Sequence, residues 1–442
     1  MANTKLNRTS GTPTSSKKFT ISFWVKRNNL GSGGAGHIFD TYVDGTNRSQ
    51  IGFDDDVIDF RLQVSGSNIG RLLTNRKFRD ISAWYSIVAS VDTTLGTADD
   101  RVKLYVNGVQ ETSFSNRINP SVNADFPMGG THTIGAYGGG SNYFDGTLSH
   151  FHFVDGEAYP ASTFGSVDAT SGIWKINTSP SVTYGNNGFF ILKDGNTITD
   201  QSGESNDFSL GGGTLTKTQD CPDNNFATWN PLVQQSSGFV LSNGNTTADN
   251  TNDTWRSVYS TLAPSVGKYY FECKIVNQLQ TPRSIIGVCS TTQASNSSAR
   301  LGYEGTNAYA YGSDGNKINN GTNTSYGNTF ATGDIISCGL DLDNGKIYFG
   351  KNGTWQNSGD PTSGSTGTGS AFNVTLGESY YFGSASYGNE GIISINAGNG
   401  YFGTTAVTTN SGNGYAGTDG KSIFNYQPPT GYSALSTKGL NL

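Results

Sequence analysis

Residues 102–109 read VKLYVNGV, a short alternating strand that enters an Asn-Gly turn and leaves it in a second strand. The stretch from Ile335 to Trp355 holds two more such turns, Asn-Gly at 344–345 and at 352–353. Asn and Gly tolerate the positive φ angles of a tight hairpin, so both stretches predict antiparallel β structure. They lie in separate glycine-rich blocks with little helical periodicity between them. The chain is therefore predicted to be all-β, with two antiparallel, jelly-roll-like β-sandwich domains in tandem.

The order of strand and turn patterns divides the chain into four segments. Residues 1–160 and residues 236–400 are each expected to form a sandwich, because short alternating strands recur there with clusters of Gly, Asn and Asp between them. Residues 161–235 are expected to form a connector with short strands. Residues 401–442 are expected to form a C-terminal tail or docking arm.

Composition excludes several kinds of partner. The net charge is −6, which argues against a nucleic-acid partner because such proteins need a cationic surface. Only 14% of residues are charged and 60 are glycine, so the surface is polar but weakly charged, as in extracellular or virion proteins that face glycans. Residues 1–10 are polar, which argues against a secretory signal peptide. No apolar run reaches the length of a membrane helix, so no membrane insertion is expected.

A series of short sequence motifs in the first block resembles those of the concanavalin A-like, laminin G-like fold. In order, they are Phe23-Trp24-Val25-Lys26, Trp84-Tyr85, Leu104-Tyr105-Val106-Asn107-Gly108 and Phe144-Asp145-Gly146-Thr147-Leu148. This resemblance covers most of the block, and its motifs are mainly structural.

The second block is similar to SPRY domains. The similarity is carried by residues 267–275 (GKYYFECKI), by residues 286–288 (IGV) and by residues 333–353, which contain the two Asn-Gly turns. SPRY domains are interaction modules that bind through loops at one end of the sandwich. The resemblance therefore implies recognition and no catalysis.

Three sequence motifs in the connector look like motifs in predicted structural proteins of tailed phages from marine bacteria. They are residues 172–175 (GIWK), 200–203 (DQSG) and 220–228 (DCPDNNFAT). This resemblance implies a virion protein that is assembled in the host cytoplasm and exposed on the particle surface.

Aromatic and amide side chains on glycine-rich loops predict a glycan site. Sugars offer apolar ring faces and hydroxyl rims, which Tyr stacking and Asn or Asp hydrogen bonds match. The loop from Tyr137 to Asp145 combines these features, and the second block offers a comparable set. The candidate ligand-binding residues are Tyr137, Asn142, Tyr143, Asp145, Tyr303, Tyr309, Asp314 and Trp355. The alternative is that these aromatic residues only pack the loops, and the sequence does not separate the two interpretations.

Two clusters offer metal-binding chemistry. Asp54 and Asp56 belong to the one concentrated acidic cluster and would supply hard oxygen ligands to calcium; the alternative is a solvated hairpin. His150 and His152 have the i, i+2 spacing of two metal-bound imidazoles; the alternative is polar positions on a half-exposed strand. No other cofactor is indicated.

Catalytic patterns are weak. The seven Glu residues are dispersed, and Glu272 stands alone on its strand, whereas retaining glycan hydrolysis needs two closely placed carboxyl groups. The four cysteines are scattered, which predicts free thiols and assembly in a reducing compartment.

The expected function is that of a non-enzymatic phage virion surface protein, of the tail fibre, spike or head fibre type. Its expected partner is a host cell-surface glycan or receptor. The alternative is a capsid or tail decoration protein that contacts other virion proteins, and a glycan hydrolase is a more distant alternative. A symmetric homo-oligomer such as a trimer is expected, because many weak contacts raise avidity.

Overall fold

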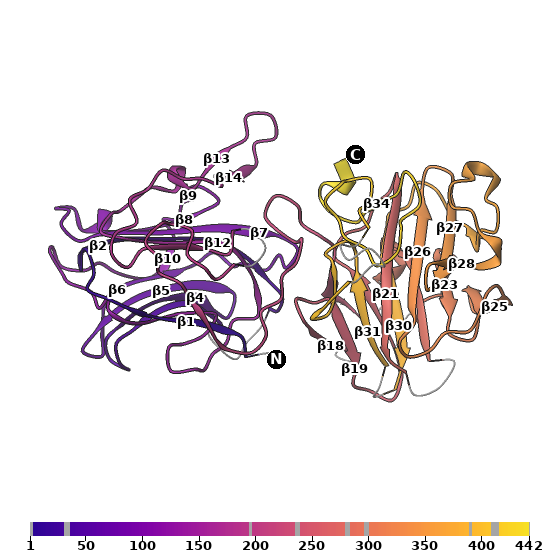
Figure 1. Ribbon diagram of the computed structural model, residues 1–442, viewed down its shortest axis with the longest axis horizontal. Helices are drawn as coiled ribbons and strands as arrows, with labels where there is room; N and C mark the ends of the chain where they lie inside the picture. The colour runs from indigo at the N-terminus through magenta and orange to yellow at the C-terminus, as the bar shows by residue number, and fades with distance from the viewer. Residues whose placement is uncertain are drawn as a thin grey trace. The chain divides into compact units, whose positions relative to one another are not determined.

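The computed structural model describes residues 3–30, 36–193, 197–234, 239–278, 283–295, 300–388, 391–407 and 415–441. The chain is nearly all β, and its sheets are almost entirely antiparallel, which confirms the predicted fold class. Two compact units are present (Figure 1). The first contains Met1–Lys217 and Cys221–Asp223, and the second contains Thr218–Asp220 and Asn224–Leu442.

Two antiparallel sheets form the first unit. In spatial order, the eight-stranded sheet contains β10 (Phe114–Ile118), β6 (Ser67–Thr74), β5 (Val57–Val64), β4 (Arg48–Asp54), β3 (Gly36–Tyr42), β11 (Gly130–Ile134), β1 (Lys5–Ser10) and β16 (Ser209–Gly212). The six-stranded sheet contains β15 (Phe189–Ile191), β12 (Gly146–Asp155), β2 (Lys18–Arg27), β7 (Trp84–Asp92), β8 (Val102–Val106) and β9 (Val109–Gln110). The short 3-10 helices η1 (Ala98–Asp100) and η2 (Ala161–Thr163) lie between strands.

Aromatic side chains fill the space between these two sheets. Side chains alternate between the two faces of a strand, so every second residue of each sheet points into the core. Phe39 of the eight-stranded sheet has its ring centroid 5.5 Å from the rings of both Phe151 and Phe153 of the six-stranded sheet. The core therefore joins strands that are more than a hundred residues apart in sequence.

The Asn-Gly turn at residues 107–108 forms as predicted. Asn107 has φ 47° and Gly108 has φ 78°, and Val106 pairs directly with Val109. Gly108 also has a packing role, because a Cβ on it would lie 2.2 Å from an atom of the Trp174 ring. The tight turn and the hairpin that carries Trp174 are thus fitted to each other.

Most of the predicted connector belongs to the first sandwich. Strand β15 pairs with β12, and β16 pairs with β1, so residues up to 217 extend both sheets. The segment also covers the outer face of the six-stranded sheet, which buries β2 on both faces rather than on one. A separate hairpin, β13 (Gly165–Val167) with β14 (Trp174–Ile176), projects from this unit (Figure 1).

The second unit also contains two main sheets. The seven-stranded sheet contains β17 (Trp229–Gln234), β20 (Trp255–Ser260), β30 (Tyr380–Tyr387), β22 (Ser284–Ser290), β23 (Ala308–Gly312), β24 (Asn316–Asn319) and β25 (Thr322–Ser325). The nine-stranded sheet contains β18 (Phe239–Ser242), β19 (Thr247–Asn250), β31 (Gly391–Asn396), β21 (Lys268–Asn277), β26 (Ile335–Asp341), β27 (Lys346–Lys351), β28 (Thr354–Trp355), β29 (Phe372–Asn373) and β34 (Ser433–Ala434). Smaller elements are α1 (Thr291–Ala294), η3 (Gln356–Ser358), η4 (Gly364–Thr366), η5 (Gly439–Asn441) and the pair β32 (Tyr401–Phe402) with β33 (Thr405–Ala406).

The sheets of the second unit meet through a stacked aromatic pair. The ring centroids of Phe271 on β21 and Phe382 on β30 are 4.0 Å apart. Cys273, Cys289 and Cys338 are buried, free cysteines of this unit (hereafter the three buried cysteines), and burial raises the pKa of each thiol. No helix in the described ranges is long and apolar enough to span a membrane.

The two Asn-Gly turns of the second unit differ from each other. Asn352 and Gly353 form the expected two-residue turn, with φ 48° and 82° and with Lys351 paired to Thr354. At residues 344–345 the expectation of a tight turn is corrected. There Asp341 pairs with Lys346 across a four-residue loop, which the Asp341 carboxylate stabilises by accepting backbone N–H groups.

Candidate binding surfaces

A glycine-rich loop, residues 135–145, lies against the eight-stranded sheet; we call it the Gly138 loop. Its turn is closed by the N–H of Gly140, which donates to the carbonyl oxygen of Tyr137 at 2.7 Å. The N–H of His37 on β3 donates to the carbonyl oxygen of Asn142 at 3.1 Å. A Cβ on Gly138 would lie 2.4 Å from the Cβ of Tyr42, so only glycine allows the loop to approach the strand this closely.

Tyr137 fixes the Gly138 loop to the sheet. Its ring is edge-on to the rings of Tyr42 and His37, with centroids 5.4 and 5.5 Å apart. The guanidinium of Arg48 lies 4.6 Å from the centroid of the Tyr137 ring, a cation–π contact. Tyr137 is thus half-buried, and its ring packs against Tyr42, His37 and Arg48.

The other three candidates on the loop have different surroundings. Asn142 is exposed and has φ 50°, and Tyr143 beside it is half-buried. Asp145 is half-buried and accepts a hydrogen bond from Asn28 Nδ2 at 3.3 Å, and burial raises its pKa. Asn142 and Tyr143 therefore lie on the arm of the loop that runs beside β3, with Asn142 exposed, whereas Tyr137 and Asp145 are held by packing and hydrogen bonding.

Four polar side chains form a row across the sheet; we call them the polar row. Asn7 on β1 is opposite Thr133 on β11, Thr133 is opposite Asp40 on β3, and Asp40 is opposite Gln50 on β4. The apolar residues beside them in sequence belong to the core of the sandwich. The polar row therefore lies on the outer face of the eight-stranded sheet, the face that carries the Gly138 loop.

The Gly138 loop contacts the polar row at Asp40. The N–H of Gly138 donates to Asp40 Oδ2 at 3.0 Å. Asp40 is fully buried, and burial raises its pKa to about 6. Burial, followed by the positive charges of Arg48 and Arg61, lowers the pKa of nearby His37 to about 4. At neutral pH the site thus contains an ionised carboxylate, that of Asp40, and a neutral imidazole, that of His37.

Asp54 and Asp56, the candidate calcium ligands, lie beside arginine side chains. The carboxylate of Asp56 pairs with Arg79 at 2.6 Å and with Arg27 at 3.2 Å, and these bonds lower its pKa. Asp54 is more exposed and lies 3.8 Å from Arg61. In the described ranges, no group of three His, Cys, Asp or Glu side chains is placed to hold a metal ion.

The His150–His152 pair does not share a regular strand face. A register shift separates Ser149 from His152, and His150 has φ 48°. The buried ring of His152 stacks on Phe190 with centroids 3.8 Å apart, and its Nδ1 is 2.8 Å from the Tyr184 hydroxyl. Burial lowers its pKa well below the usual value. His152 is a packed aromatic residue of the six-stranded sheet.

The four candidates of the second unit do not converge on one surface. Tyr309 is only 5% exposed and packs in the core between the sheets. Tyr303 packs in a separate cluster on the seven-stranded sheet, where its ring lies 3.6 Å from the Arg300 guanidinium. Asp314 closes its own turn by accepting hydrogen bonds from Asn316. Trp355 packs against Tyr270, with ring centroids 6.2 Å apart.

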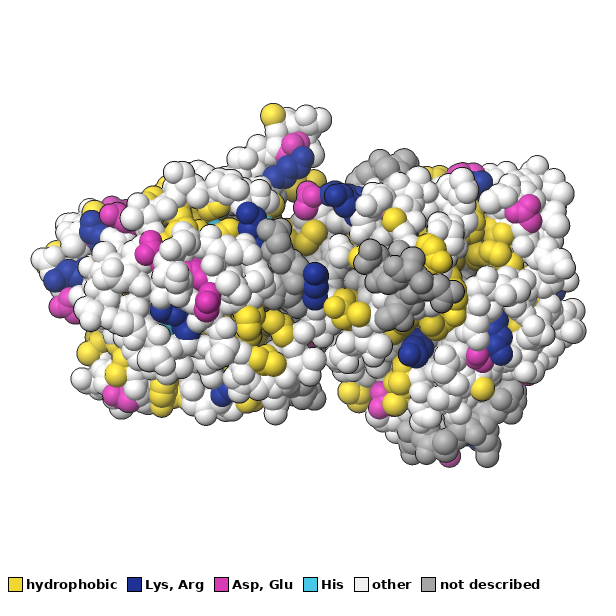
Figure 2. All heavy atoms as spheres, viewed as in Figure 1, with side chains coloured by type: hydrophobic (Ala, Val, Ile, Leu, Met, Phe, Trp, Pro, Cys, Tyr) yellow, Lys and Arg dark blue, Asp and Glu magenta, His cyan; other side chains and the backbone are white. Residues whose placement is uncertain are grey.

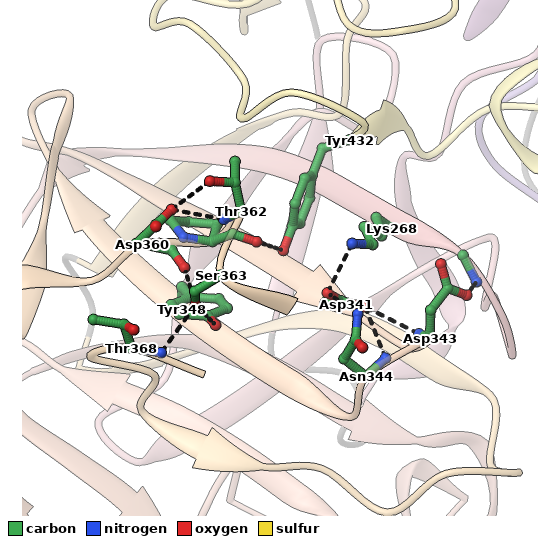
Figure 3. A network of polar contacts seen from close by, with 12 residues as sticks. Lys268, Asp341, Asp343, Asn344, Tyr348, Asp360, Thr362, Ser363, Thr368 and Tyr432 are labelled. Carbon is green, nitrogen blue, oxygen red and sulfur yellow. Dashed lines mark hydrogen bonds and ion pairs between the residues drawn. The ribbon is translucent and has the colours of Figure 1, made fainter. Parts of the chain in front are cut away.

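Trp355 lies beneath the C-terminal arm, by which we mean residues 415–441. Strand β34 of this arm pairs in parallel with β21, and Phe424 and Tyr432 of the arm pack in the same cluster as Trp355. The Tyr432 hydroxyl donates to the carbonyl oxygen of Pro361 at 3.1 Å (Figure 3). Residues 415–441 of the predicted tail therefore dock on the second unit.

A buried carboxylate anchors this arm. Glu272 on β21 accepts the backbone N–H groups of Asn425 and Tyr426 at 2.8 and 2.7 Å. The Tyr270 hydroxyl and the Asn396 side-chain amide also donate to Glu272, at 3.0 and 3.3 Å. Burial raises the pKa of Glu272 to about 7. Both carboxylate oxygens are used in holding the arm, which gives this isolated residue a structural role.

A second polar network supports the same sheet beside the arm. The Lys268 ammonium pairs with Asp341 at 3.1 Å, and Asp341 also accepts the N–H of Asn344 at 2.9 Å (Figure 3). The Tyr348 and Ser363 hydroxyls are 3.3 Å apart and tie β27 to the following loop. These contacts stabilise the loops at this edge of the sheet.

Sequence reasoning missed the polar row and the Glu272 anchor. Glu272 carried a signal, because it is the only carboxylate on its strand and lies directly between the core residues Phe271 and Cys273. Asp40 and Gln50 carried a weaker one, because each follows or precedes a core residue. Their alignment depends on the pairing of β1, β3, β4 and β11, which the sequence alone does not fix.

Comparison with known proteins supports two different modules. Residues 2–162 match the concanavalin A-like lectin/glucanases superfamily, and residues 268–372 match the SPRY domain. Human (Homo sapiens) Ran-binding protein 9 is 35% identical over 94 residues, which are 21% of this chain and 12% of that protein. Danio rerio Ran-binding protein 10 is also 35% identical over 94 residues, 21% of this chain and 15% of that protein. The chain thus spans a small part of the length of these relatives.

Solved structures give similarities of the same kind. The SPRY domain of human HERC1 is 20% identical, with a TM-score of 0.30, and the match covers 38% of this chain and 96% of that one. A heptameric SAP-like pentraxin from Limulus polyphemus is 20% identical, with a TM-score of 0.30, and the match covers 43% and 89%. On the two family matches, this chain carries a concanavalin A-like domain followed by a SPRY domain, folds that typically serve as protein- or carbohydrate-binding modules.

Proposed function

We propose that the protein is a non-enzymatic surface protein of a phage virion and that it binds a glycan on the host cell through the Gly138 loop. The observation that carries this proposal is the arm of that loop beside β3, where exposed Asn142 is followed by half-buried Tyr143. An amide and an aromatic ring in this arrangement suit the hydroxyl rim and the apolar face of a sugar.

The surface chemistry supports the proposal. Charged side chains are scattered thinly over the face seen in Figure 2, and most of that face consists of uncharged polar side chains and backbone. This agrees with the low charged fraction of the chain, 14%. The sequence motifs at residues 172–175, 200–203 and 220–228, which resemble those of phage structural proteins, support the proposal that the protein belongs to a virion. The folds of both domains, which are generally non-catalytic, support a binding role.

Multivalent display supports attachment through weak single sites. A shallow loop site buries little area, and sugars give up well-made hydrogen bonds to water when they bind. We therefore propose that the protein acts as a symmetric homo-oligomer such as a trimer, in many copies per particle. Effective concentration then raises avidity by about 100-fold or more without any new contact.

A clustering experiment tests this function. The full chain is placed on beads at high density, and bead binding to cells of the phage's host is compared with binding of the soluble protein. We expect binding only in the clustered form, and we expect Asn142→Ala with Tyr143→Ala to reduce it about tenfold or more. Asn116→Ala, which changes an exposed residue on strand β10 of the same sheet, is the matched control and is expected to bind normally.

A second function, capsid or tail decoration, is favoured by a different feature. The projecting β13–β14 hairpin carries exposed Val167 and Ile173, 61% and 63% accessible. Exposed apolar side chains of this kind suit a contact with another virion protein. If clustered protein ignores host cells while particles that lack it lose capsid or tail stability, decoration replaces attachment as the function.

A further inference from the structure

The polar row contains an unusual set of unpartnered atoms. Asn7 Oδ1, Thr133 Oγ1, Asp40 Oδ1 and Gln50 Oε1 are all buried, and none has a hydrogen-bond partner among the described residues. His37 Nδ1, beside the row, is also buried and has no hydrogen-bond partner among the described residues. Asp40 and Thr133 are 0% exposed, and Gln50 and His37 are each 5% exposed. These side chains are therefore shielded from solvent without being satisfied by the protein.

Unpartnered buried atoms also occur elsewhere among the described residues, but several of them gather in the polar row near the Gly138 loop. Farther along the same face, Arg61 is opposite Gln50, and its charge is met by Asp59. Arg71 donates to both oxygens of Asp59 at 2.9 Å. These three charged side chains on the same face are thus paired. The polar row departs from that pattern where the Gly138 loop begins to cover the sheet.

The unpartnered atoms share one chemical character. Two carbonyl-type oxygens, one carboxylate oxygen and one hydroxyl oxygen offer acceptor positions, and a buried acceptor without a donor destabilises the native state. Native proteins satisfy nearly all such groups. A ligand that fits the row must therefore bring several hydrogen-bond donors.

We infer that the polar row is a subsite for one saccharide unit with several free hydroxyl donors, and that the Gly138 loop moves outward to admit it. The inference rests on the proposed glycan-binding function and deepens it by naming the seat of the sugar. Asn142 and Tyr143 then hold the exposed part of the glycan, while Asp40, Thr133 and Gln50 accept hydrogen bonds from its buried ring. The single N–H contact from Gly138 to Asp40 is the hydrogen bond that the sugar replaces.

A pair of Thr→Val variants separates binding from structure. Thr133 Oγ1 is unpartnered, so Thr133→Val is expected to leave the melting temperature unchanged or raise it, while weakening saccharide binding about tenfold. Thr41, on the neighbouring strand, donates to the carbonyl oxygen of Pro127 at 2.8 Å. Thr41→Val is the matched control, and it is expected to lower the melting temperature by several degrees without changing saccharide binding.

Binding is measured by retention of the full chain on columns that carry single sugars. The columns bear glucose, galactose, mannose, N-acetylglucosamine or glucosamine, so that hydroxyl-only donors are distinguished from an ammonium donor. Wild type and Thr41→Val are expected to be retained on at least one hydroxyl-bearing column, and Thr133→Val and the volume-conserving Gln50→Met are expected to elute early. Retention on glucosamine alone overturns the hydroxyl assignment.

Other outcomes also overturn the inference, and they leave the proposed function standing or falling separately. Equal retention of wild type, Thr133→Val and Gln50→Met overturns it, and so does the absence of retention on every column. A fall in melting temperature for Thr133→Val as large as that for Thr41→Val overturns it too, because the hydroxyl then has a structural partner. If clustered wild type still binds host cells through Asn142 and Tyr143, the subsite fails while glycan attachment stands.

Discussion

Acid is expected to destabilise the first unit through His132, a buried residue of β11. Its ring lies among the core aromatic residues, with centroids 5.5 Å from Phe39 and 5.2 Å from Phe153. Nδ1 is 3.2 Å from an Arg8 guanidinium nitrogen, and Nε2 is 3.2 Å from the Met128 carbonyl oxygen. Arg8 only donates, so these contacts require the neutral tautomer with its proton on Nε2. Burial, and then the charge of Arg8, lower the pKa of His132 to about 3.

The size of the effect follows from the difference between the folded and unfolded pKa values. In the unfolded chain a histidine has a pKa of about 6.5, so the unfolded state gains a proton below that pH while folded His132 remains neutral. The stability that the neutral ring contributes is therefore present above pH 6.5 and is lost as the pH falls toward 3. At about 1.36 kcal/mol per pH unit, acidification from 6.5 to 4.5 costs about 2.7 kcal/mol from this group alone.

Urea denaturation of wild type and His132→Gln, followed by tryptophan fluorescence, measures this effect. The amide of Gln can also donate and accept, so the variant is expected to fold while losing the titration. Between about pH 7 and about pH 4.5, wild type is expected to lose about 2.7 kcal/mol more stability in the first unit than the variant. An equal loss in the two proteins would refute the assignment of a neutral, buried His132.

Three further predictions concern packing, the arm and the thiols. Gly108→Ala forces a Cβ against the Trp174 ring at a positive φ angle, so it is expected to destabilise the first unit by about 1–3 kcal/mol in urea denaturation; an unchanged midpoint contradicts this. Glu272→Ala leaves two arm N–H groups without their acceptor, so it is expected to destabilise the second unit by about 2 kcal/mol or more, with faster amide exchange in the arm. The three buried cysteines are expected to resist a thiol reagent in native protein and to react after denaturation; rapid native labelling of all of them argues against the packed core.

Local patterns in the sequence predicted the fold well where the chain decides its own conformation. The turns at 107–108 and 352–353 form as expected, because Asn and Gly adopt the positive φ angles that such turns need. The turn at 344–345 is longer, because the Asp341 side chain captures backbone N–H groups and stabilises a wider loop. A competing side-chain interaction of this kind is not visible in the Asn-Gly pair itself.

The candidate site was predictable only in its exposed part. The glycine and aromatic content of residues 137–145 indicated a surface loop, and Asn142 lies exposed on it. The polar row was not predictable, because its four members come from strands that are distant in sequence and become neighbours only through sheet register. The packing of Tyr309 and Trp355 was not predictable either, since aromatic residues suit both binding and packing, and the residues that contact them come from segments distant in sequence.

The way each unit closes has a consequence for how the chain can be rearranged. In the first unit β1 pairs with β16, so Lys5 lies opposite Gly212. In the second unit the N–H of Ala227 donates to the carbonyl oxygen of Leu435 at 2.9 Å. In each unit the first and last segments of the chain are thus hydrogen-bonded neighbours, so the chain enters and leaves the unit at nearly the same point. Such a unit tolerates circular permutation and transplantation into a surface loop of another protein, because neither operation pulls its first and last strands apart.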